Sequence, residues 1–171
     1  SLLRLNAIGE HFEEAIKNAT DYEGFLHQLL RMEVDAEEER AKERKIKAAK
    51  FPYRKYIEDL EMDLLPEAMR KRLPELCSLD FIRESKNIIM TGNPGTGKTH
   101  TAIGLGIKAC EQGYRVLYTT IPYLVTELKE SNSQQKLRSY QKRFEKYDLI
   151  IADELGYISF DREAADLLFT V

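Results

Sequence analysis

The 171-residue sequence has no tryptophan and only two cysteines, Cys77 and Cys110. Two cysteines without a metal-ligand spacing favour buried or partly exposed free thiols in a reducing cytoplasm. No apolar run is long enough to cross a membrane, and no signal peptide is recognisable at Ser1. We therefore expect a cytoplasmic protein that does not engage a membrane. The chain also lacks a strong charge of one sign, because its formal net charge is −3. Any affinity for nucleic acid must come from local basic clusters.

What the sequence does contain is the segment Gly92–Thr99, GNPGTGKT, which fits the pattern G-x-x-x-x-G-K-[ST] and is called the P-loop below. Glycines let such a loop wrap closely around a polyphosphate with backbone N–H groups pointing inward. Lys98 brings a positive charge to the β- and γ-phosphates, and the hydroxyl of Thr99 is offered to Mg²⁺. We interpret His100 as a packing or hydrogen-bonding residue rather than a catalyst. The residues predicted to hold the nucleotide are Gly92, Asn93, Pro94, Gly95, Thr96, Gly97, Lys98, Thr99 and His100.

The residues around the P-loop predict a strand, the loop and a helix in that order. Residues 87–91 form a short, mostly apolar run, as expected of a buried parallel strand. Residues 101–112 predict a helix that starts near Lys98, and the positive end of its dipole would face a bound phosphate. Gly113 stands where a helix-ending glycine is expected. A second strand is predicted over 114–120, followed by another helix.

The N-terminal part of the sequence predicts helices. Apolar residues over 2–16 recur near the helical period. A second helix is predicted to start after Thr20 and Asp21, either of which could cap it, and to continue towards Lys50. Pro52 ends that helix. We therefore place a helical N-terminal domain at 1–51 and the first part of an α/β ATPase domain at 52–171.

A second candidate site segment is 147–154, YDLIIADE, an apolar run that ends in two carboxylates. Asp153 would lie beside the P-loop and hold Mg²⁺ through its water shell, and Glu154 would polarise the water that attacks the γ-phosphate. The predicted catalytic residues are thus Glu154 and Lys98, and the predicted metal-site residues are Thr99 and Asp153. Asp153 to Gly156 also fits the D-x-x-G of GTPases, but no Asn-Lys-x-Asp stretch that would read guanine occurs in the sequence. We therefore expect ATP or ADP rather than a guanine nucleotide.

Two segments carry a local excess of positive charge. Eight Lys or Arg residues oppose one Glu over 40–55, and six oppose two Glu over 129–146. Segregated charge is often only a solvated helix face, and that interpretation stays open. The alternative is contact with the phosphate backbone of DNA. The candidate contacts are Lys136, Arg138, Lys142 and Arg143 in the second segment, and Arg44, Lys45 and Lys47 in the first.

Several stretches together resemble the IstB-like transposition helper ATPases. They are LDFI at 79–82, GNPGTGKTH at 92–100, QGYRV at 112–116, DELGY at 153–157 and DREAADLLF at 161–169. This family is similar to the helicase loader DnaC, and both are AAA+ ATPases. The resemblance implies a P-loop NTPase fold of the AAA+ type, with a parallel sheet flanked by helices behind a small helical domain.

The resemblance also implies ATP and Mg²⁺ as ligands, a homo-oligomer assembled on duplex DNA, and recruitment or stimulation of a transposase. A strand with a polar sensor residue, an arginine finger and a helical lid should follow residue 171. In related helicase loaders and initiators a helical element between the second and third strands faces the nucleic acid, and 129–146 occupies that position.

Two alternatives stay open. A DnaC-like replicative helicase loader would carry the same motifs. A nucleotide-switched DNA-binding module could also carry them without significant hydrolysis. Glu154 favours hydrolysis, because a pure switch needs no carboxylate that polarises water.

Overall fold

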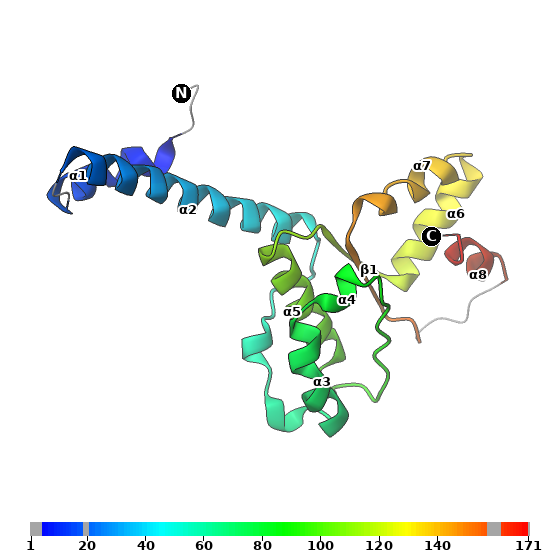
Figure 1. Cartoon of the computed structure of the whole chain (residues 1–171). Coiled ribbons are helices and arrows are strands. Elements are labelled where there is room, and N and C mark those ends of the chain that lie inside the picture. Colours follow the sequence, from blue (N-terminus) through cyan, green and yellow to red (C-terminus); the bar gives the residue numbers. More distant parts are fainter. Residues whose placement is uncertain (1–4, 19–20, 157–161, 171) are drawn as a thin grey trace. The chain divides into compact units, whose positions relative to one another are not determined.

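The computed structural model describes residues 5–18, 21–156 and 162–170. It forms two compact units, Ser1–Arg44 and Lys45–Val171 (Figure 1). The sequence places the domain boundary after residue 51, whereas the units divide after Arg44, because Ile46 and Ala49 are buried in the core of the second unit. None of the helices in the described ranges is long and apolar enough to cross a membrane.

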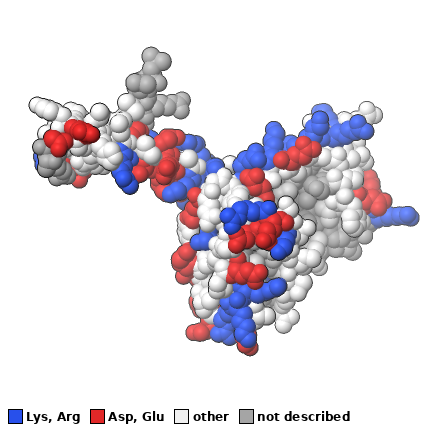
Figure 2. Space-filling view, in the orientation of Figure 1, with Lys and Arg blue, Asp and Glu red and all other residues white. Residues whose placement is uncertain are grey.

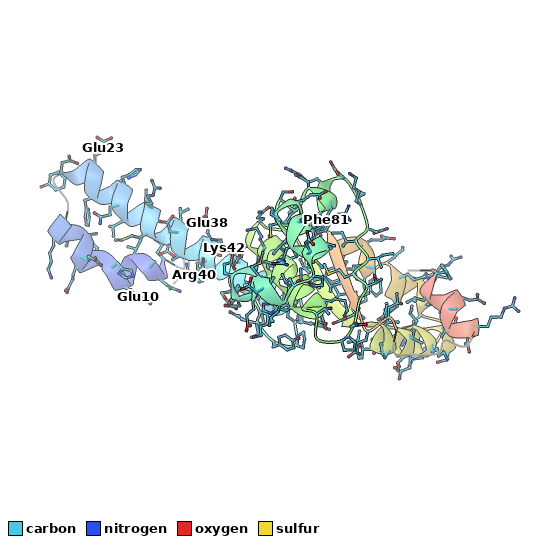
Figure 3. All side chains as sticks on the ribbon, turned by 90° about the horizontal axis from the view of Figure 1, so that it is seen from below. Glu10, Glu23, Glu38, Arg40, Lys42 and Phe81 are labelled. Carbon is cyan, nitrogen blue, oxygen red and sulfur yellow. The ribbon has the colours of Figure 1, made fainter. Side chains whose placement is uncertain are left out.

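The first unit contains α1 (Asn6–Asn18) and most of α2 (Tyr22–Ala48), which lie side by side (Figure 3). Glu33 on α2 accepts the backbone N–H of Ile8 at 3.0 Å, and it also accepts a hydrogen bond from the guanidinium of Arg40 at 2.7 Å. Ile8 lies in the first turn of α1, where N–H groups have no partner within the helix. The N–H of Ile8 and the charge of Arg40 both lower the pKa of the buried Glu33 carboxyl. A charged group thus joins the two helices.

The second unit is built around a parallel pair of strands, β1 (Val116–Thr120) and β2 (Leu149–Asp153). The register pairs Thr120 with Asp153. Because side chains alternate along a strand, Tyr118 lies on the same face of the sheet as Asp153. The two-stranded parallel sheet with helices around it confirms the predicted α/β class.

The helix α5 (Lys98–Glu111) covers that face of the sheet. The helix packs closely on β2 at Gly106, where an added Cβ would lie only 2.7 Å from Cδ1 of Ile151. The same Cβ would lie 2.8 Å from the ring of Phe51, which packs beside the helix. The helix ends at Glu111, and Gly113 follows it as predicted, with φ +96°. The N–H of Gly113 bonds the carbonyl of Cys110, and that of Tyr114 bonds the carbonyl of Ala109, both at 3.0 Å. These two hydrogen bonds are those of a Schellman motif at the C-terminus of a helix.

The other face of the sheet is covered by α6 (Ile121–Ser133) and α8 (Arg162–Leu168). Leu117 of β1 packs there against a buried cluster that includes Leu128 and Phe144. Residues 137–146 form two short helical elements rather than one continuous helix, and the ring of Phe144 lies 5.3 Å from that of Tyr140 on the same core. The remaining elements are η1 (Ile57–Asp59), η2 (Met62–Leu64), α3 (Glu67–Cys77), α4 (Asp80–Arg83), α7 (Leu137–Gln141) and η3 (Phe144–Lys146).

The strand predicted over 87–91 is wrong for this structure. Those residues form no strand, and Ile88 and Ile89 are 37% and 82% exposed. A strand needs a neighbour to satisfy its backbone groups, and β2 pairs only with β1 among the described residues. A cavity of about 230 Å³ lies where Ile88 and Met90 face Leu149 and Ile151.

The two cysteines are free thiols, as the sequence predicts. Cys110 is buried, and burial raises the pKa of its thiol to about 11. Burial also raises the pKa of Cys77, which is half-buried. Both side chains are therefore neutral at physiological pH.

Candidate nucleotide site

The P-loop turns sharply at two glycines before α5 begins. Gly95 has φ +80° and Gly97 has φ +77°, backbone conformations that side chains with a Cβ rarely adopt. A Cβ at Gly97 would also lie 2.8 Å from Cδ2 of Leu65, which belongs to a buried cluster with Leu60 and Leu73. The glycine therefore lets this cluster support the loop from below.

The ammonium group of Lys98 lies over the P-loop itself. Its Nζ donates to the carbonyl oxygens of Gly92 at 2.9 Å and Asn93 at 2.6 Å, and lies 3.3 Å from Oγ1 of Thr96. The hydroxyl of Thr96 in turn donates to the carbonyl of Asn93 at 2.9 Å. The ammonium group of Lys98 is thus bonded to carbonyl oxygens of the loop. A bound anion would compete with these oxygens for the ammonium group.

The carboxylate of Asp153 is the point at which three elements meet. Its Oδ2 accepts the hydroxyls of Thr99 and Tyr118, both at 2.9 Å, and its Oδ1 accepts the backbone N–H of Glu154 at 2.8 Å. Thr99 lies in the first turn of α5, Tyr118 lies in β1 and Asp153 ends β2. Burial of Tyr118 and its bond to Asp153 both raise the pKa of the tyrosine. The phenol therefore stays protonated and donates to the carboxylate.

Glu154 follows the last residue of β2 in a left-handed backbone conformation, with φ +64°. A residue other than glycine is uncommon there, and such positions often belong to functional sites. The side chain is exposed and lines a cavity of about 630 Å³. This cavity brings together most of the predicted site residues, namely Pro94, Gly95, Gly97, Lys98, Thr99, His100, Asp153 and Glu154.

His100 connects the P-loop helix to the segment before η1. Its Nε2 lies 2.8 Å from the carbonyl oxygen of Tyr56. Because a carbonyl only accepts, this hydrogen bond requires the proton on Nε2. The imidazole is thereby engaged with the backbone.

Sequence reasoning missed the residues that line the cavity opposite the P-loop. Pro52, Tyr53, Tyr118 and Thr120 belong to this lining. Because side chains alternate along a strand, the sequence places Tyr118 and Thr120 on one face of the strand 116–120. In the observed register Asp153 lies on the same face. No pattern in the sequence indicated that Pro52 and Tyr53 come close to the P-loop.

The donors at this site suit a hard cation with a polyphosphate. Thr99 and Asp153 offer hydroxyl and carboxylate oxygens, which are ligands that Mg²⁺ prefers, and Mg²⁺ typically completes its shell with water and phosphate. The pattern of the family described as "IstB-like ATP binding protein" matches residues 2–171 of this chain. The chain belongs to the IstB-like ATP-binding family.

Related proteins of insertion sequences agree with this family. The IstB-like chain is 34% identical over 173 residues to a protein of insertion sequence IS21 from Pseudomonas aeruginosa that is named for ATP binding; the match covers 99% of this chain and 65% of the relative. It is 36% identical over 159 residues to a similarly named protein of insertion sequence IS5376 from Geobacillus stearothermophilus, covering 93% and 63%. A protein of IS232 from Bacillus thuringiensis is 29% identical over 171 residues. The chain therefore spans about two thirds of the length of these relatives.

The basic segment 129–146 of the IstB-like chain is exposed around α7, where blue side chains gather in Figure 2. Lys136, Arg138 and Lys142 are exposed, and Lys136 lies 3.4 Å from Oε1 of Gln134. The guanidinium of Arg143 lies 5.2 Å from the ring centroid of Tyr140. These side chains can reach an external anion.

Two of the three candidate DNA contacts in the N-terminal segment already bind groups of the chain itself. Arg44 forms an ion pair with Glu37 at 2.7 Å. Lys45 donates to the carbonyl of Gly113. Lys47 is exposed. Arg44 and Lys45 would therefore have to exchange an existing partner for a phosphate, which makes α7 the stronger of the two candidate surfaces.

Proposed function

We propose that this IstB-like chain is the nucleotide-binding part of an ATP-hydrolysing helper protein of insertion-sequence transposition. In this proposal the protein works in the cytoplasm, assembles as a homo-oligomer on duplex DNA with ATP, and recruits or stimulates a transposase. The observation that carries the nucleotide role is the 2.9 Å hydrogen bond between Thr99 and Asp153, since it joins the end of the P-loop to the carboxylate at the end of β2. The names of the relatives support the role in insertion sequences.

Each site residue has a separate task in the proposal. Lys98 exchanges the carbonyl oxygens of the P-loop for the β- and γ-phosphates, and the N–H groups of the loop and of the start of α5 bind the same oxygens. Thr99 and Asp153 would hold Mg²⁺, which neutralises charge on the phosphates when bound. Glu154 orients and polarises the attacking water, because its carboxylate lines the cavity next to Asp153.

The proposed binding of DNA rests on α7 and its surroundings. A second cavity of about 330 Å³ adjoins this surface, and its lining includes Lys50, Arg143, Glu127 and four tyrosines, Tyr118, Tyr123, Tyr140 and Tyr147. Basic side chains neutralise backbone phosphates without reading the sequence, so binding would be largely independent of the DNA sequence. The transposition role is preferred to helicase loading because the relatives named above belong to insertion sequences.

Two variants of the full-length protein test the proposal. We expect Lys98→Ala to abolish ATP binding, because the phosphates lose their cation, and Lys108→Ala on the same helix to bind normally. Glu154→Gln should bind ATP and lose turnover, measured as phosphate release with duplex DNA present. Wild-type turnover by Glu154→Gln would show that Glu154 does not polarise the water. Undiminished ATP binding by Lys98→Ala would overturn the assigned nucleotide site.

A further inference from the structure

The hydroxyl of Tyr118 makes a hydrogen bond for which the proposed function gives no reason. It donates to Oδ2 of Asp153 at 2.9 Å, the same oxygen that accepts the hydroxyl of Thr99. Tyr118 lines the cavity that also contains Lys98. We infer that Tyr118 is a positioning residue that holds the Asp153 carboxylate in the orientation needed for a Mg²⁺–nucleotide complex. This inference rests on the proposed nucleotide site.

The strand register explains why this tyrosine can reach Asp153. Tyr118 pairs with Ile151, and Thr120 pairs with Asp153. Tyr118 and Asp153 are therefore diagonal neighbours on one face of the sheet, within reach of a long side chain. A tyrosine spans this diagonal with its ring and places only the hydroxyl at the carboxylate.

The position of Tyr118 is fixed from several sides. Its backbone N–H donates to the carbonyl of Ala49 at 2.8 Å, on the edge of β1 away from β2. Its ring lies 6.2 Å from that of Phe51, and Phe51 in turn packs where Gly106 leaves room on α5. A donor held in this way costs little conformational entropy when it bonds the carboxylate.

The hydroxyl has a specific effect on Asp153. One carboxylate oxygen accepts two hydroxyls and the other accepts the N–H of Glu154, so both oxygens are tied to protein donors. The proton of Thr99 then points at Asp153, which leaves the lone pairs of Thr99 available to a cation. Without the phenol, the carboxylate loses one of the three bonds that stop it from rotating. Groups that orient metal-site residues in this way typically change metal affinity by about 10- to 100-fold when removed.

The experiment is a Mg²⁺ titration of nucleotide binding in the full-length protein, read from the fluorescence of a methylanthraniloyl derivative of ADP. Tyr118→Phe keeps the ring and removes only the hydroxyl. We expect the Mg²⁺ concentration at half-saturation to rise roughly tenfold, while affinity measured in EDTA stays within about twofold of wild type. Tyr114→Phe, another half-buried tyrosine beside the same strand, is the matched control and should titrate like wild type.

The same substitution made in the Asp153→Ala variant distinguishes positioning of the Asp153 carboxylate from a merely structural role of Tyr118. In Asp153→Ala there is no carboxylate to hold, so adding Tyr118→Phe should change the Mg²⁺ titration no further. The inference is overturned if Tyr118→Phe titrates like wild type, if its loss of affinity is equal in EDTA and in Mg²⁺, or if its effect persists in Asp153→Ala. Wild-type protein that binds no nucleotide would overturn the proposed function together with this inference, whereas normal wild-type binding with an unchanged Tyr118→Phe overturns the inference alone.

Discussion

The side-chain hydroxyl of Thr99 lies 2.9 Å from Oδ2 of Asp153, although the two residues are 54 positions apart in the sequence. The fold explains why they meet. Thr99 lies in the first turn of the helix that covers one face of the sheet, and Asp153 ends the strand beneath it. In parallel α/β sheets ligands bind outside the carboxyl ends of the strands, which is where this pair lies.

The first prediction concerns this pair. We expect Thr99→Ser to keep Mg²⁺-dependent nucleotide binding, because the hydroxyl that bonds Asp153 is retained. Thr99→Ala should weaken binding in Mg²⁺ by about tenfold or more and leave binding in EDTA nearly unchanged. Calorimetric titration of both variants with ADP, with and without Mg²⁺, measures the difference. Equal weakening in both conditions would show that Thr99 acts on the loop rather than on a cation.

The sequence predicted more of the candidate site than of the fold. The P-loop and the Asp153–Glu154 pair are local patterns, and the apolar run that ends in the two carboxylates indicates a strand whose end lies beside the P-loop. The approach of Tyr53 to the same cavity depends on packing between distant segments, which no local pattern encodes, whereas strand alternation gives the face of Tyr118 but not the register that brings it to Asp153. Apolar composition likewise predicted a strand at 87–91, but pairing depends on a neighbour that local sequence does not reveal.

The second prediction concerns Gly106, whose lack of a side chain lets α5 approach Ile151 and Phe51. A Cβ there would lie within 2.8 Å of both side chains, so the helix must move or the core must repack. We expect Gly106→Ala to lower the free energy of unfolding by about 1–3 kcal/mol. Gly9 on α1 has nothing within 4 Å of an added Cβ. Gly9→Ala should therefore be neutral or stabilising by up to about 1 kcal/mol.

Urea denaturation followed by circular dichroism compares the two glycine variants. A Gly106→Ala protein as stable as wild type would mean that the interface between α5 and β2 tolerates a methyl group. In that case glycine would not be required for the close packing of this helix on the sheet.

The third prediction concerns DNA and the exposed surface around α7. Replacing Lys142 and Arg143 by Ala in the full-length protein should weaken duplex binding and flatten the plot of log affinity against log salt, by roughly 0.9 for each phosphate that the protein no longer neutralises. The charge-matched control replaces Lys71 and Arg72 on α3, where Lys71 is paired with Glu67 at 2.6 Å. Anisotropy titrations with ATP across salt concentrations give both slopes. Unchanged affinity and slope would leave α7 as a solvated face.

The last prediction concerns residues 87–91 and the edge of β2 that has no strand partner among the described residues. Ile88 and Ile89 are exposed, and Ile150 of β2 is 38% exposed beside the cavity that separates the two segments. Apolar side chains next to unpaired backbone groups are what a further strand would cover. The chain covers 65% and 63% of the length of the IS21 and IS5376 relatives. We propose that a further strand of the longer protein covers this edge.

We therefore expect the backbone amides of 87–91 to exchange with deuterium rapidly in the 171-residue chain and at least about tenfold more slowly in the full-length protein. The amides of β1 serve as the internal control, because they already have partners and should be protected in both. Equally rapid exchange of 87–91 in both proteins would show that this segment stays outside the sheet, and the P-loop would then be supported by α5 and the Leu65 cluster alone.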